Sequence, residues 1–114
     1  MNSESWVRKI SDNDRSEKVL RLTDAKLRIP SAAFIEGDSP DPYVATETNS
    51  PIQITWSDGK RTKHFVRGDT NRYMITDRSN SVGAFYDKVG PTVTHIIITA
   101  IEDGDFLVTP LVNF

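Results

Sequence analysis

The chain has 114 residues, of which 37% are hydrophobic and 26% are charged, and its formal net charge at pH 7 is −2. This length suits one domain with a single core, and the composition excludes collagen-like, disordered and membrane-spanning chains. The absence of cysteine excludes disulfides, thiolate metal sites and cysteine nucleophiles. The N-terminal residues have neither a basic start nor an apolar segment, so no secretory signal is visible and we expect a cytoplasmic protein.

Alternation of apolar and polar residues dominates the chain and predicts strands. In chain order the predicted strands cover 6–10, 19–22 with 27–29 (one interrupted strand or two short ones), 52–57, 60–67, 72–76, 95–101 and 106–112. Asp58-Gly59 predicts a hairpin with a type I′ turn, and the segment 102–105 predicts another hairpin. About seven strands favour a barrel or a sandwich.

Two short helices interrupt this pattern. Pro30 and Ser31 stand where a helix starts, and the predicted helix stops at Gly37. The apolar spacing over Ser79–Val89 predicts a second helix, which Gly90-Pro91 closes. No repeat and no internal boundary is visible, so residues 1–114 are expected to form a single domain.

The charges are segregated along the chain. Residues 1–30 carry seven Lys or Arg against five Asp or Glu, and residues 58–78 carry six against three. Residues 31–57 and 79–114 are acidic, with net charges of −4 and −3. If the fold brings the two basic blocks together, one face becomes suited to a polyanion; otherwise all four blocks are ordinary solvated surface.

The sequence offers little for catalysis. His64 and His95 both lie in strand-like segments, where a histidine is more often packed or exposed than catalytic or metal-binding. No serine stands in a nucleophile elbow, and no glycine-rich loop matches a phosphate-binding motif. The acidic segment 102–105 lacks the spaced ligands of a calcium loop. We therefore expect a protein without catalytic activity, metal or cofactor.

Two polar segments between predicted strands are more informative. Segments 11–16 and 67–72 mix Arg, Asn, Asp, Ser and Thr, the side chains that contact base edges and phosphates. Both could be plain polar loops, because Asn, Asp, Gly and Ser dominate turns. That alternative explains the arginines and the cationic segment 60–63 less well.

At these residues the sequence resembles the DNA-binding pseudobarrel domain called B-three. Trp6–Asp14 and Leu27–Phe34 resemble the family's opening, a first strand with a "leucine, serine or threonine, x, x, aspartate" turn, then an "I-P" step into a short helix. Arg72–Thr76 resembles its "Y-V-L-T" strand, Ser79–Lys88 the following helix, and Asp103–Val108 the start of its last strand. The resemblance covers most of residues 6–112. It is nearer to the N-terminal effector domains of EcoRII-type restriction endonucleases than to the plant transcription factors.

The resemblance implies a mainly β fold, a seven-stranded open β-barrel (the pseudobarrel) with two short helices, that holds double-stranded DNA by two arms in the major groove. The implied DNA-binding residues are Arg8, Ser11, Asn13, Asp14, Arg15, Ser16 and Lys18 in the first arm, and Lys63, Arg67, Asp69, Thr70, Asn71 and Arg72 in the second. Arginine suits guanine, asparagine suits adenine, and aspartate accepts from cytosine or orients an arginine. The candidates for phosphate contacts are Arg8, Lys9, Lys18, Lys60, Arg61 and Lys63.

These expectations describe a monomeric, non-catalytic recognition domain of a restriction-type system, or a stand-alone DNA binder. Nuclease activity would need a separate domain or a partner chain. Arg15→Ala and Arg72→Ala are expected to weaken DNA binding without lowering stability, since both residues are placed in polar loops. Both arms should lie on one face, away from 36–47 and 102–105.

Two other classes of protein remain open at this point. One is a small β-barrel protein-interaction module of phage or bacterial type that uses the acidic segment 36–47 and binds no DNA. The other is a small-ligand or sugar-binding barrel that uses Trp56 and other aromatic residues.

Overall fold

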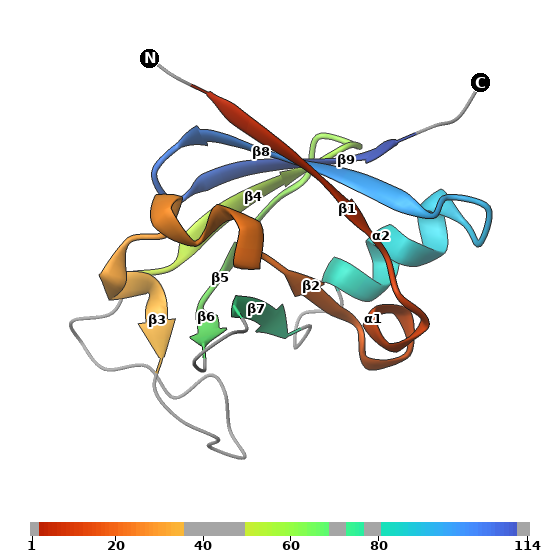
Figure 1. The fold of residues 1–114 in the computed structure, drawn as a ribbon, viewed down its shortest axis with the longest axis horizontal. Helices are drawn as coiled ribbons and strands as arrows, with labels where there is room; N and C mark the ends of the chain where they lie inside the picture. Colours follow the sequence, from red (N-terminus) through yellow and green to blue (C-terminus); the bar gives the residue numbers. More distant parts are fainter. Residues whose placement is uncertain (1–2, 36–49, 69–72, 77–80, 112–114) are drawn as a thin grey trace.

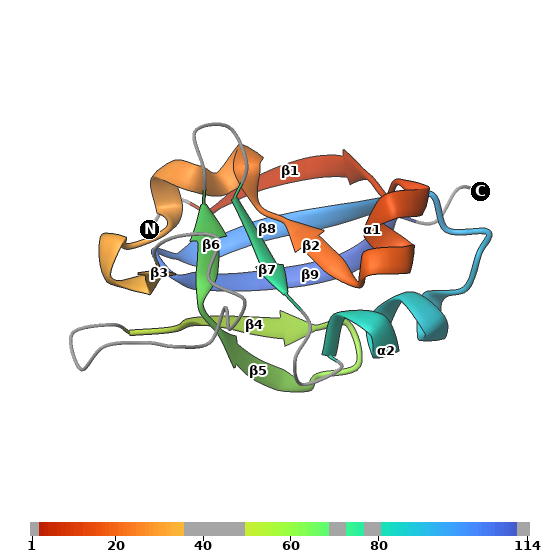
Figure 2. The ribbon, with the colours of Figure 1, turned by 90° about the horizontal axis from the view of Figure 1, so that it is seen from below.

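Two β-sheets form the framework, and their facing sides enclose the core (Figures 1 and 2). The computed structural model describes residues 3–35, 50–68, 73–76 and 81–111. The elements are β1 (Glu4–Lys9), α1 (Asp12–Glu17), β2 (Val19–Arg21), two 3-10 helices (Thr23–Arg28 and Ser31–Ala33), β3 (Phe34–Ile35), β4 (Ile52–Trp56), β5 (Arg61–His64), β6 (Val66–Gly68), β7 (Tyr73–Thr76), α2 (Ser81–Val89), β8 (His95–Glu102) and β9 (Asp105–Leu111). The predicted mainly β class is confirmed.

One sheet has the strand order β1-β8-β9-β4-β5 and the other β2-β7-β6-β3. The β4–β9 and β3–β6 pairs are parallel, and the other pairs are antiparallel. The predicted strand over 60–67 divides at Phe65 into β5 and β6, which belong to different sheets. This division lets the chain cross from the first sheet to the second. The described residues thus hold nine strands and form no closed barrel.

The strand predicted over 27–29 is wrong. Leu27 and Arg28 end a 3-10 helix, and the Leu27 side chain is 89% exposed. An apolar residue there made the segment look like a strand, although the segment contributes only Ile29 to the core. The neighbouring helix prediction after Pro30 is correct in position, but it is a single 3-10 turn followed by β3.

Alternation in the strands supplies the core directly. Ile52, Ile54 and Trp56 of β4 are buried, whereas the residues between them are half-buried. Other strands contribute Leu20, Val66, Ile75, Ile96, Ile98, Phe106 and Val108, all at most 1% exposed. These side chains belong to one cluster that both sheets share, so strand register and burial are fixed together.

The predicted hairpin at Asp58-Gly59 forms, but its turn is not type I′. That turn needs positive φ at both central residues, and only Gly59 has it, at 91°. The Gly59 N–H donates to the Trp56 carbonyl at 2.9 Å, and the Trp56 N–H donates to the Lys60 carbonyl at 2.8 Å. These bonds define a three-residue loop closed by a left-handed glycine.

Helix α2 lies within the predicted range and ends where expected. Gly90 has a φ of 81°, and its N–H donates to the Tyr86 carbonyl at 3.1 Å, which ends the helix in a left-handed residue. Val82, Phe85 and Tyr86 are buried against the core. None of the helices in the described part of the chain has the length and apolar character needed to cross a membrane.

We expect Trp56→Ala to lower the free energy of unfolding by about 3–5 kcal/mol, because it leaves a large cavity in the core. Trp56 is 4% exposed and lies 5.0 Å from Phe85 between ring centroids. Urea unfolding measures the change. Val7→Ala is the control, since Val7 is 59% exposed and its loss should cost almost nothing. Equal stability of the two variants would contradict this account of the core.

Candidate nucleic-acid interface

The first predicted arm is a helix and not a polar loop. Ser11 caps α1: its hydroxyl accepts from the Asp14 N–H at 3.0 Å, and the Asp14 carboxylate accepts from the Ser11 N–H at 3.1 Å. This reciprocal capping box corresponds to the Ser-x-x-Asp pattern of residues 11–14, which is a sequence signal for the start of a helix. The segment was predicted as a loop because it contains no apolar residue to show helical periodicity.

Asp14 belongs to the framework of the arm. It is 3% exposed, and its Oδ1 accepts from the Arg21 Nε at 2.7 Å while Oδ2 accepts from Ser11. The 20%-exposed Arg21 side chain shields this ion pair, so α1 is tied to β2. Both carboxylate oxygens are therefore engaged within the protein, and we remove Asp14 from the set of base contacts.

Arg15 is also held within the protein. Its Nη2 donates to the carbonyl oxygens of Gly90, at 3.1 Å, and Val93, and its guanidinium lies 5.7 Å from the centre of the Tyr86 ring. These contacts join α1 to the connection between α2 and β8. The expectation that Arg15 lies in a polar loop is wrong, and its replacement by alanine should lower stability.

The remaining predicted residues of the first arm differ in their availability. Arg8 is half-buried on β1 and its Nη1 contacts the Asp24 carboxylate at 3.1 Å. Ser11 serves as the helix cap, although it is exposed. Asn13, Ser16 and Lys18 are exposed, and Lys18 ends the helix with a φ of 55°. The acidic Asp12 and Glu17 of α1 are exposed as well, so the surface of this arm carries both signs of charge.

The second predicted arm is only partly described. Lys63 is exposed on β5 and Arg67 is half-buried on β6. The Arg67 Nε is buried without a hydrogen-bond partner among the described residues. The predictions for Asp69, Thr70, Asn71 and Arg72, and for the acidic segment 36–47, lie outside the described residues.

Strand register aligns two arginines on one face of the four-stranded sheet. Arg21 of β2 and Arg67 of β6 both stand directly opposite Met74 of β7. Opposite residues share a face, so the three side chains form one row across the sheet. All three are half-buried, whereas Leu20 and Ile75 in the adjacent position are fully buried on the core side. We call the side that carries this row the outer face.

Arg21 was missed in the sequence because nothing local distinguishes it. The residues around Arg21 have the alternation of an ordinary strand. Only the pairing of β2 and β6 with β7 places Arg21 in the same row as Arg67. Two strand spacings separate the Cα atoms of these arginines, about 10 Å. Two guanidinium groups thus lie on a short stretch of sheet, and that of Arg21 is paired with the Asp14 carboxylate.

The same register sets where the arms leave the sheet. Lys18 leads into the end of β2 that pairs Val19 with Thr76. At the opposite end, β6 finishes at Gly68, which pairs with Tyr73, whose carbonyl accepts from the Leu22 N–H at 2.7 Å. The arm at 11–18 and the Gly68 end of β6 therefore lie at opposite ends of the strands that carry the arginine row.

The acidic turn at 102–105 lies away from the first arm. It adjoins the Glu4 end of β1, whereas α1 follows the Lys9 end. Arg28 contacts both the Asp103 carboxylate, at 2.6 Å, and the Glu4 carboxylate, at 2.9 Å. The Asp103 hydrogen bond, with that of Glu4, raises the pKa of Arg28 above its ordinary value. These contacts tie the turn to the 3-10 helix at Thr23–Arg28. The turn lies away from the first arm, as predicted.

The fold is similar to that of two solved structures. One is the hypothetical Arabidopsis thaliana protein At1g16640.1, with a TM-score of 0.54 at 10% identity over 96% of this chain and 91% of that chain. The other is the N-terminal domain of Helicobacter pylori LlaJI.R1, with a TM-score of 0.51 at 12% identity over 96% and 88%. At these identities the likeness concerns the fold alone, and it fits a B-three-like fold.

No protein-family model and no curated protein matches the sequence. Within the described ranges, no group of three or more His, Asp or Glu side chains is arranged to hold a metal ion.

We expect Asp14→Ala to lower the free energy of unfolding by at least about 2 kcal/mol, because it removes the capping box and leaves Arg21 without its carboxylate. Asn13→Ala is the matched control on the same helix turn; Asn13 is exposed, so its loss should cost under about 0.5 kcal/mol. Urea denaturation gives both values. A difference of less than about 0.5 kcal/mol between the variants would show that the ion pair does not support the arm.

Tyr86 gives a prediction at alkaline pH. Its hydroxyl donates to the Val19 carbonyl at 2.7 Å, and burial raises its pKa above the ordinary 10.0. The folded state therefore keeps the proton more tightly than the unfolded state. This contribution to stability is complete below about pH 10 and is lost as the pH rises further. Wild type should lose more stability than Tyr86→Phe above that pH in denaturation series; parallel pH profiles would contradict the assignment.

Proposed function

We propose that this chain binds double-stranded DNA on the outer face of the four-stranded sheet, between the arms at 11–18 and 63–72. Three observations support the proposal: the motifs that resemble the B-three domain, the likeness in fold to two solved structures, and the arginine row across β2, β7 and β6. The arginine row carries the most weight, because it depends on strand pairing and not on sequence similarity.

The Arg67 side chain has a hydrogen-bond donor that a bound anion could satisfy. The Arg67 Nε is buried and has no hydrogen-bond partner among the described residues, so this N–H has lost water without gaining a protein acceptor. Phosphate oxygens accept charge-assisted hydrogen bonds from arginine, so a turn of the half-buried side chain toward a bound DNA backbone would give this N–H an acceptor. Arg21 lies on the same row with its Nε engaged by Asp14, so its orientation is fixed before a ligand arrives. The row therefore favours an anionic, repeating ligand such as the DNA backbone.

The first arm would supply base contacts in the major groove, where all four base pairs differ, and its exposed candidates are Asn13 and Ser16. Lys18, Lys63 and Arg67 would contact phosphates. Asp14 and Arg15 position α1 and do not contact DNA in this proposal. Arg21 joins the contact set.

We further propose that the two sheets correspond to the open seven-stranded pseudobarrel. β5 and β6 then count as one strand interrupted at Phe65, and the two-residue β3 is an addition to the seven. The chain would act as a non-catalytic, monomeric recognition domain, either alone or beside a nuclease domain or partner chain. The protein-interaction alternative rests on 36–47, and no described feature favours it.

The test measures binding of the chain to a fluorescently labelled pool of random duplexes. Fluorescence anisotropy at several salt concentrations gives the binding constant K. Each lost phosphate contact lowers the slope of log K against log salt by about 0.9. We expect Arg67→Gln to weaken binding and reduce the slope by about one such contact. Lys88→Gln removes the same charge from α2, outside the four-stranded sheet, and should leave the slope unchanged.

Failure of wild type to bind any duplex at low salt would overturn the proposal. Equal effects of Arg67→Gln and Lys88→Gln would overturn the assignment to the outer face, because binding would then follow net charge alone. Circular dichroism of both variants checks that the fold is intact.

A further inference from the structure

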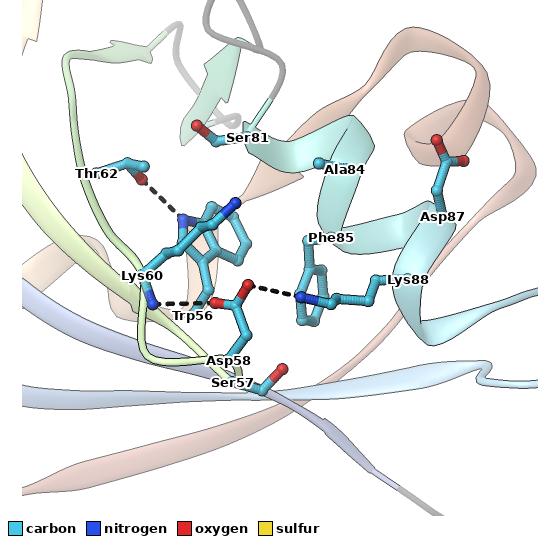
Figure 3. A pocket seen from close by; sticks show the side chains of 10 residues that line it. All are labelled: Trp56, Ser57, Asp58, Lys60, Thr62, Ser81, Ala84, Phe85, Asp87 and Lys88. Carbon is cyan, nitrogen blue, oxygen red and sulfur yellow. Dashed lines mark hydrogen bonds and ion pairs between the residues drawn. The ribbon is translucent and has the colours of Figure 1, made fainter.

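A groove of about 820 Å³ lies between the β4–β5 hairpin and helix α2 (Figure 3). This volume is within the range of small-molecule sites, roughly 300–1,000 Å³. The groove shares no residue with the arginine row, since its walls belong to β4, β5, their turn and α2. It therefore needs an explanation separate from DNA binding.

Two aromatic rings form the base of the groove. Trp56 is 4% exposed and Phe85 is 5% exposed, with their ring centroids 5.0 Å apart and their planes inclined by 39°. The Trp56 indole N–H donates to the Thr62 hydroxyl at 2.7 Å, and that hydroxyl lies 2.6 Å from the His64 Nε2. The rings are fixed and their polar atom is satisfied, so the small surface that they expose to the groove is apolar.

An ion pair spans the two walls. Asp58 of the hairpin turn contacts the Lys88 ammonium of α2 at 2.8 Å, and its second oxygen accepts from the Lys60 N–H at 3.0 Å. Lys88 first, and the Lys60 N–H next, lower the pKa of Asp58 below its ordinary value. A polypeptide running through the groove would have to break this bridge. The bridge therefore favours a ligand small enough to lie on one side of it.

The charge of the groove favours an anion. Asp58 is neutralised by Lys88, whereas the Lys60 ammonium has no carboxylate partner among the described residues. Figure 3 shows the Lys60 side chain on the Trp56 side of the groove, whereas Asp87 lines the groove from α2, on the side remote from Trp56. One positive charge thus stands beside the aromatic base.

We propose that this groove binds a small planar aromatic carboxylate. The ring system would lie against Trp56 and Phe85, beside the Ala84 methyl group, and the carboxylate would contact the Lys60 ammonium. The binding is non-covalent, and the Asp58–Lys88 bridge can remain in place beside the ligand.

The test uses 2-naphthoate as the probe, and its neutral analogue 2-naphthamide, in an NMR titration of the wild-type chain. The chain has two tryptophans, so two indole N–H signals are available. The Trp56 signal should shift saturably with naphthoate. Trp6 is the internal control: it lies on β1, at the far edge of the five-stranded sheet from β5, and its signal should stay in place.

Three variants test whether the carboxylate of the ligand contacts Lys60. Lys60→Gln should weaken naphthoate binding about fivefold, as expected for an exposed charge pair, and leave naphthamide binding unchanged. Arg61→Gln removes the neighbouring charge, which does not line the groove, and should change neither ligand. Ala84→Trp should fill the groove and abolish binding of both.

Several results would overturn the proposal. They are no saturable Trp56 shift, equal shifts of both indoles, or equal naphthoate affinity in wild type and Lys60→Gln. Uptake of an apolar amidated peptide in place of naphthoate would make the groove a protein-docking surface and would also overturn it. Loss of DNA binding does not enter this test, so the two proposals fail independently.

Discussion

The ion pair between Asp14 and Arg21 is the contact on which the arrangement of the candidate interface depends. One carboxylate caps α1 through Ser11 and holds the Arg21 guanidinium on β2. Burial makes the pair costly to break from one side, because the remaining charge would be left without a partner. The helix can therefore carry many polar residues and still keep a defined position. Arg15 adds a second attachment, to the connection that follows α2.

Strand β7 organises the rest of the interface, because it pairs with β2 on one side and β6 on the other. Two segments far apart in sequence thereby reach one sheet, and their arginines reach one row. The pairing also explains how the charges are distributed in space. The basic blocks of the sequence supply β2, β5, β6 and β7, whereas the acidic turn at 102–105 adjoins the Glu4 end of β1. The groove at α2 uses other residues, so the two proposed sites do not overlap.

The sequence predicted those elements whose burial follows a simple period. β4 and β8 alternate cleanly, and α2 has apolar residues at helical spacing with a glycine end, so their positions were predictable. The positions of elements held by polar contacts could not be predicted in this way. Helix α1 depends on a capping box and an ion pair, and the 3-10 helix at Thr23–Arg28 exposes Leu27. The role of Asp14 could not be separated from DNA contact by residue type, since both uses need a carboxylate. Arg21 required the register of β7, which no local pattern contains.

The central claim is that the outer face of the four-stranded sheet binds duplex DNA. The most direct measurement is an NMR titration of the isotope-labelled chain with a duplex selected from a random pool, following the backbone amides. The account predicts shifts concentrated in β2, β6, β7 and α1, with the β8 and β9 amides unchanged apart from small uniform effects. Shifts confined to β1, β8 and β9, or to the groove between the β4–β5 hairpin and α2, would contradict it.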